Sequence, residues 1–139
     1  MKTQNEITKI TDEQEFQKAY QIANTIFEQI KYTADSAIMM CWGISKKFVA
    51  RYDGKDGLFL QVNGFAHKGI VGIVLNEGKD LYEIHLFKNR THECIKSLDE
   101  VFCEDLGRLI DELIEKPENV SDKQYSEQSK KAFYKVIFE

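Results

Sequence analysis

The chain has 139 residues, of which 42% are hydrophobic and 30% are charged, and it contains one proline. This composition is typical of one globular domain, and it excludes a disordered polar chain, a collagen-like repeat and a small disulfide scaffold. The longest apolar run, residues 37–44, is too short to span a bilayer, so we expect no membrane association. We therefore treat residues 1–139 as a single domain, of which residues 1–11 precede the first predicted element and could be disordered.

Charge and cysteine content indicate the setting of the protein. The formal net charge is −4, but residues 93–118 carry nine acids and three bases, a local net of −6, whereas residues 32–92 carry eight bases and six acids, a local net of +2. Such a polarised surface is not typical of a nucleic-acid-binding protein. The three cysteines show no C-x-x-C spacing, and the N-terminus lacks the apolar segment of a secretory signal. The sequence therefore predicts a reduced, cytoplasmic protein.

The first predicted element is a helix from Asp12 to Lys31. Thr11 and Gln14 have the spacing of a capping box at its start. Apolar residues recur at intervals of three and four and would share one face of the helix: Phe16, Ala19, Tyr20, Ala23, Ile26, Phe27 and Ile30.

From residue 38 the apolar period changes to two. Even positions from Ile38 to Tyr52 are mostly apolar, which predicts one long or bent strand, or two short ones. Further strands are expected at residues 58–62, 65–75 and 81–87. The turns between them are expected at residues 53–57, at Asn63-Gly64 and at residues 76–80.

These three turns give registers that place apolar residues on one face of a four-stranded meander. They predict that Tyr52 lies beside Leu58, Val62 beside Phe65, and Leu75 opposite Tyr82; a slip by one residue would break the agreement. The predicted core face consists of Phe48, Leu58, Leu60, Val62, Val71, Ile73, Leu75, Ile84 and Leu86.

Two C-terminal helices are predicted to follow the sheet. Ser97 and Glu100 form a capping box, and Lys116-Pro117 would end the first helix; a second begins near Ser121. The helical residues expected in the core are Phe16, Ala23, Phe27, Phe102, Leu106, Leu109 and Phe133. The predicted order is α-β-β-β-β-α-α, which is an α+β domain.

Motifs for catalysis or metal binding are weak. The predicted registers place His67 and His85 on opposite sheet faces, so we expect no metal site and no cofactor. The sequence has no G-x-S-x-G motif and no glycine-rich phosphate loop. No set of residues can be assigned the roles of acid, base and nucleophile, which favours a protein without enzymatic activity.

The second face of the predicted sheet carries aromatic and basic residues. The registers bring together Arg51, Phe59, Lys68, Ile70, His85 and Phe87. A helix of the chain, a second copy or a protein partner could cover such a patch, and single-stranded nucleic acid could stack on it. Nucleic acid is the least favoured of these, because only Arg51, Lys68 and the nearby Lys47 could contact phosphates.

These observations support two functional hypotheses. The favoured one is a non-enzymatic, cytoplasmic protein-binding or self-associating module that uses the second-face patch. The alternative is a small enzyme or ligand-binding domain with a cleft between sheet and helices, lined by polar-tipped side chains. The cleft residues of this alternative are Trp42, His67, Tyr82 and Asp105.

Overall fold

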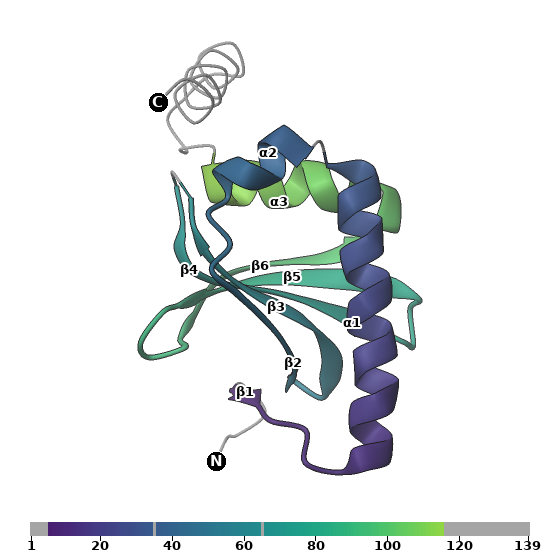
Figure 1. Cartoon of the computed structure of the whole chain (residues 1–139). Helices are drawn as coiled ribbons and strands as arrows, with labels where there is room; N and C mark the ends of the chain where they lie inside the picture. Colours follow the sequence, from purple (N-terminus) through teal and green to yellow (C-terminus); the bar gives the residue numbers. More distant parts are fainter. Residues whose placement is uncertain (1–5, 35, 65, 116–139) are drawn as a thin grey trace.

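The computed structural model of the protein describes residues 6–34, 36–64 and 66–115. Its elements are β1 (Ile7–Thr8), α1 (Glu13–Thr33), α2 (Ser36–Cys41), β2 (Lys46–Tyr52), β3 (Lys55–Asn63), β4 (Lys68–Asn76), β5 (Leu81–Lys88), β6 (Cys94–Val101), the 3-10 helix η2 (Cys103–Asp105) and α3 (Leu106–Glu115). The strands form one antiparallel sheet in sequence order. α1 runs along one side of the sheet, and α3 crosses the same side beside α2 (Figure 1). The α+β class is confirmed, with six strands instead of the four expected.

The long helix α1 begins one residue later than the predicted capping box requires. Asp12 is the N-cap, and its carboxylate accepts a hydrogen bond of 2.9 Å from the backbone N–H of Glu15. The predicted cap at Thr11 is therefore wrong by one residue. Ala19, Ala23, Ile26 and Ile30 are the buried residues of the helix, as the spacing predicts.

The segment before β2 is a short helix and not a strand. Ile38 and Met40, which the alternating pattern placed in a strand, lie in α2, and both are exposed. Gly43, with a φ of 62°, follows the helix and has its N–H bonded to the carbonyl of Met40. The even-position pattern was misleading here because it combines residues of two different elements, the exposed residues of α2 and the residues of β2.

The turn between β2 and β3 corrects the predicted register of β2. The connection is the two-residue turn Asp53-Gly54, with φ values of 52° and 74°, and not a loop of five residues. Val49 therefore lies opposite Leu58, where Tyr52 was expected beside Leu58. Because the shift is an odd number of residues, every side chain of β2 lies on the face opposite to the predicted one.

The connection between β3 and β4 is longer than the predicted Asn63-Gly64 turn. Asn63 pairs with Lys68, and the N–H groups of Ala66 and His67 donate to the carbonyl of Ile114 at the end of α3. Val62 therefore pairs with Gly69 and not with residue 65. This pairing partner differs from the expected one by an even number of positions, so the side chains keep their predicted faces.

The register of β4 with β5 is confirmed. Leu75 pairs with Tyr82, and Ile73 pairs with Ile84, as the turn at residues 76–80 predicts. The following segment differs: Ser97 lies in β6 and caps no helix, and α3 begins only at Leu106. The predicted helix start failed because the capping-box residues pair with β5 as an edge strand instead.

The helix-covered face of the sheet is one hydrophobic core with α1 and α3. It contains the buried residues Leu58, Leu60, Val62, Val71, Ile73, Ile84 and Leu86 from the strands. Leu60 and Ile73 share this face, as predicted. Phe48 lies on the other face, and the helical-core expectation is wrong for Phe16 and Phe102, which are 37% and 53% exposed. Phe133 and the helix expected from Ser121 lie outside the described residues.

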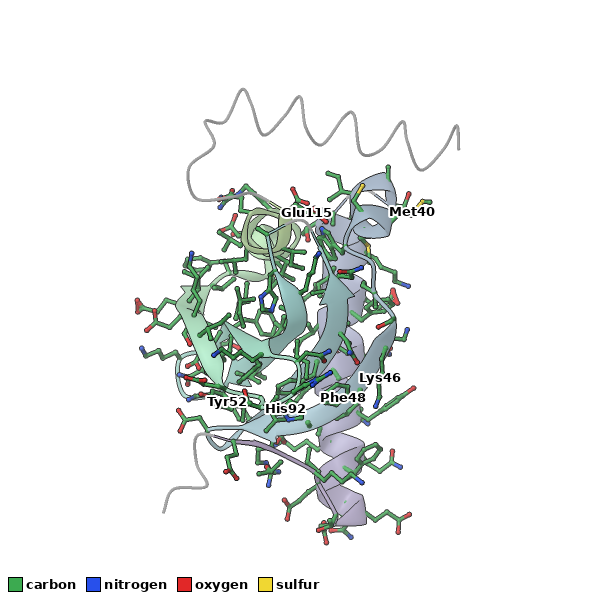
Figure 2. The ribbon with its side chains drawn as sticks, turned by 90° about the vertical axis from the view of Figure 1, so that its left-hand side faces the viewer. Met40, Lys46, Phe48, Tyr52, His92 and Glu115 are labelled. Carbon is green, nitrogen blue, oxygen red and sulfur yellow. The ribbon has the colours of Figure 1, made fainter. Side chains whose placement is uncertain are left out.

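The opposite face is concave and is also buried. Tyr52 of β2 contacts His85 and Phe87 of β5, with ring centroids 4.8 Å apart in both pairs. In a flat sheet β2 and β5 would be separated by three strand spacings, about 14 Å. The sheet is therefore curled strongly toward this side, and we call its inner surface the concave face. It lies away from α2 and α3, as Tyr52 and Phe48 do from Met40 and Glu115 in Figure 2.

The two edge strands of the sheet differ in length. β1 has two residues, which lie within the stretch expected to precede the first element, and it pairs with the end of β2. β6 has eight residues and pairs only with β5 among the strands described. In the described part of the chain, no helix is both long enough and apolar enough to cross a membrane.

Candidate functional site on the concave face

An aromatic cluster fills the centre of the concave face. Its buried residues are Ala50, Tyr52, Phe59, Ile70, Val74 and Phe87, with Ile7, Phe48 and Cys94 packed against them. The rings of Phe59 and Phe87 lie close over Gly72, where an added Cβ would come within 2.5 Å of Phe59. The glycine thus gives the two rings the space that a side chain on β4 would occupy.

A polar network adjoins this cluster at the β5–β6 side. His85 Nε2 lies 3.0 Å from Glu83 Oε1, and His85 Nδ1 lies 2.6 Å from Ser97 Oγ. Strand geometry explains the alignment: Glu83 and His85 are two residues apart and share a face of β5, and Ser97 pairs directly with His85. Glu83 and His85 are each 8% exposed, whereas Ser97 is exposed. We call these three residues the Glu83–His85–Ser97 network.

The carboxylate of Glu83 has further partners on the concave face. Asn76 Nδ2 donates to Glu83 Oε2 over 3.2 Å, and Lys55 Nζ lies 3.5 Å from the same oxygen. A buried carboxylate is costly unless it is paired and hydrogen-bonded, and here both oxygens have partners. Glu83 is therefore held in place from three sides.

The protonation state of His85 follows from its surroundings. Burial lowers the pKa of His85 below its ordinary value of 6.5, against the opposing effect of the hydrogen bond to Glu83. Neutral imidazole carries one proton, and a carboxylate can only accept, so that proton lies on Nε2. Nδ1 then has a free lone pair directed at Ser97, whose hydroxyl donates to it.

Two further polar groups border the network. Cys94 Sγ lies 3.3 Å from Ser97 Oγ. Burial raises the pKa of Tyr52 to about 12, and a hydrogen bond with Cys94 adds to this effect. At neutral pH Tyr52 is consequently a neutral hydroxyl within the aromatic cluster.

The structure separates the residues predicted to bind a partner. Phe59, Ile70, His85 and Phe87 lie on the concave face, as the patch required, but all four are buried there. Arg51 lies on the helix-covered face, because of the reversed β2 register, and its guanidinium pairs with Glu15 of α1 and with Asp56. Lys68, on β4 next to Gly69, is exposed.

The residues of the alternative cleft do not meet. Trp42 is fully buried and donates from Nε1 to Asp111 over 3.0 Å, and buried His67 has Nε2 3.3 Å from the carbonyl of Ile70. Tyr82 lies at the other end of the sheet, since it pairs with Leu75 at the far end of β4, about 23 Å from the His67 end. The four residues therefore do not line one cleft.

Among the described residues, two cavities lie elsewhere, on the helix-covered side. One, of about 490 Å³, lies beside α2 and is lined by Ala34, Met39 and Ile44 among others. The other, of about 170 Å³, lies between α1 and β2 and is lined by Phe27 and Lys47 among others. Neither is lined by a residue of the predicted cleft. Within the described ranges, no group of three or more His, Cys, Asp or Glu side chains is placed to hold a metal ion.

Sequence reasoning missed Glu83 and Ser97. The signal for Glu83 was its spacing of two from His85 on a strand, which puts both side chains on one face. The signal for Ser97 was hidden because residues 97–100 also fit a capping box. In comparisons with known proteins, no family model, no curated protein and no solved structure matched the chain.

Proposed function

We propose that the protein is a cytoplasmic binding module that associates with a second copy of itself through the edge strand β6. The observation that carries this proposal is the openness of β6, which has five exposed residues. An edge strand presents a row of backbone N–H and C=O groups that can pair with another strand. The opposite edge, β1, is too short to offer the same surface.

The sequence of β6 favours a second copy as the occupant. Ile95 and Phe102 are exposed large hydrophobic residues near the two ends of the strand, 51% and 53% exposed. Antiparallel pairing about a two-fold axis at Leu98 would bring Ile95 of one copy beside residues 101–102 of the other. The same arrangement would bring Lys96 of one copy near Glu100 of the other, residues of opposite charge. Parallel pairing would instead bring the two lysines together.

The cytoplasmic setting and the class of partner rest on other residues. Cys41, Cys94 and Cys103 are all free thiols, which suits a reducing compartment. Nucleic acid is not the partner we propose. Two of the three cations considered for phosphate contact are on the helix-covered face, where Arg51 pairs with Glu15 and Lys47 lies over the ring of Phe27 at 4.0 Å.

Sedimentation equilibrium of the full chain over a range of concentrations tests the proposal. We expect a monomer–dimer equilibrium with a dissociation constant below about 100 μM. Ile95→Glu combined with Phe102→Glu should weaken dimerisation at least about tenfold, equivalent to about 1.4 kcal/mol, because the register would bring acidic side chains of the two copies together. Tyr32→Lys is the matched control, because Tyr32 is 93% exposed at the end of α1 and should leave the equilibrium unchanged.

Two results would overturn the proposal. One is a protein that stays monomeric up to about 100 μM, well above the affinity that such an interface should give. The other is a dimer whose dissociation constant the β6 double variant leaves unchanged, which would place the interface outside β6.

A further inference from the structure

The Glu83–His85–Ser97 network has the arrangement that activates a serine hydroxyl. A nucleophilic serine requires a base within hydrogen-bond reach, about 2.6–3.2 Å, and a third group that orients the base. Ser97 Oγ lies 2.6 Å from His85 Nδ1, and His85 Nε2 lies 3.0 Å from Glu83 Oε1. Both contacts fall within that range.

The three residues of the network differ in how deeply they are buried. The base and its orienting carboxylate are 8% exposed, so water competes little for their hydrogen bonds. The hydroxyl that would react is on the exposed edge strand and can be reached from solvent. The orienting group is itself fixed by Asn76 and Lys55.

We propose that Ser97 is a nucleophile that takes an acyl group from activated acyl esters, with His85 as its general base and Glu83 as a positioning residue. The class of donor follows from the open surroundings of Ser97: a small ester with a good leaving group needs little binding energy from a pocket. The proposal is independent of dimerisation, because strand pairing at β6 uses backbone groups and leaves the Ser97 side chain on the concave face.

The reaction balances as two transfers. Ser97 Oγ attacks the carbonyl carbon of the ester while its proton passes to His85 Nδ1, and the bond from that carbon to the leaving oxygen breaks. The leaving alcohol or phenol departs with the bonding electron pair and takes the proton from the imidazolium, or from solvent. Water then attacks the acyl-serine with His85 Nδ1 as base, which releases the carboxylic acid and restores Ser97.

The test uses the full-length protein and p-nitrophenyl acetate. We expect a burst of p-nitrophenol that is stoichiometric with protein, and an acetyl group located on Ser97 by peptide mass spectrometry. Ser97→Ala should abolish this acetylation. Ser45→Ala is the matched control, because Ser45 is a serine next to β2 whose Oγ bonds the carbonyl of Gln61 over 3.5 Å and should be dispensable.

The roles of His85 and Glu83 need a readout that a structural role would not change. The acetylation rate of the wild type should fall as pH is lowered through the titration of His85. The carboxylates facing this group are Glu83 and, further off, Asp53, and the facing cation is Lys55. His85→Gln should lower the rate at least about tenfold and remove this pH dependence, and Glu83→Gln should lower the rate while keeping a dependence on pH.

Several outcomes would overturn the inference. Acetylation of Cys94, whose sulfur lies 3.3 Å from Ser97 Oγ, would assign the reactivity to the thiol. Acetylation spread over lysines, or a burst unchanged in Ser97→Ala, would show that Ser97 is an ordinary serine. Ser97→Ala should still unfold cooperatively in urea, because residue 97 is exposed, so loss of its burst would not reflect unfolding.

Discussion

The two faces of the sheet are both buried, but they are buried by different means. The helix-covered face is shielded by α1 and α3, the usual arrangement for an antiparallel sheet with one apolar face. The concave face is shielded by curvature, which brings β2 and β5 side chains into contact across β3 and β4. A sheet face that carries phenylalanines, and that no helix of the described residues covers, is therefore not by itself an exposed binding surface.

Adjacent residues of β3 offer the sharpest test of this comparison. Phe59 and Leu60 are both fully buried, and their side chains lie on the concave and the helix-covered face respectively. We expect Phe59→Ala to lower the free energy of unfolding by about 3–5 kcal/mol and Leu60→Ala by about 2–5 kcal/mol, measured by urea denaturation. A loss below about 1 kcal/mol for Phe59→Ala would show that the concave face is not a core.

The glycine beneath the concave rings should be the next most sensitive position. A Cβ on residue 72 would lie 2.5 Å from Phe59 and 3.0 Å from Phe87, so both rings would have to move. We expect Gly72→Ala to destabilise the protein by about 1–3 kcal/mol, the usual cost of overpacking. At Gly78 the nearest atom would be 3.5 Å away, so Gly78→Ala is a control with a small effect. Equal effects of the two substitutions would contradict the packing described.

The sequence predicted the helix-covered face better than the concave face for a physical reason. The face on which a strand's side chains lie is predicted wrongly only when the register is wrong by an odd number of residues. The predicted register of β3 with β4 was wrong by an even number, so Leu60 and Ile73 were still placed on the correct face. The turn at Asp53-Gly54 is shorter than predicted, so the predicted register of β2 was wrong by an odd number of residues. Arg51 and Phe48 were therefore predicted on the wrong faces. Turn length within a glycine-rich stretch is the quantity that local sequence determined least well.

The candidate site was harder to predict because it depends on two long-range facts. Ser97 meets His85 only because residues 94–101 pair with β5 as a strand, whereas their local pattern fits a helix start equally well. Glu83 is buried only because the sheet curls, and curvature has no signature in a single hydrophobic period. The sequence shows which residues are present, but it does not show that Glu83, His85 and Ser97 contact one another.

The pH dependence of stability should report on the two buried histidines, His67 and His85. Burial lowers the pKa of His67 and of His85 below 6.5, the value expected in the unfolded chain. As pH falls below about 6.5, the unfolded state binds protons that the folded state does not, so the free energy of unfolding decreases. We expect His85→Gln to show a smaller loss than the wild type between about pH 7 and pH 5.5 in urea denaturation. The same loss in both proteins would mean that His85 titrates normally.

The smallest effect should come from the ion pair between Arg51 and Glu15, which places Arg51 on the helix-covered face. Arg51 Nη2 lies 3.0 Å from Glu15 Oε1, which is possible only if Arg51 faces α1. Both side chains are partly exposed, at 32% and 55%, so solvent screening limits their coupling to less than about 1 kcal/mol. A double-mutant cycle with Arg51→Gln and Glu15→Gln should give a small favourable coupling that disappears in high salt. A control cycle with Glu13→Gln in place of Glu15→Gln should give no coupling, because the partners of the Arg51 guanidinium among the described residues are Glu15 and Asp56. A different result would contradict this placement: no coupling in either cycle in low salt, together with an altered reactivity of Ser97 in Arg51→Gln. Arg51 would then lie on the concave face, and every side chain of β2 would lie on the face opposite to the one described.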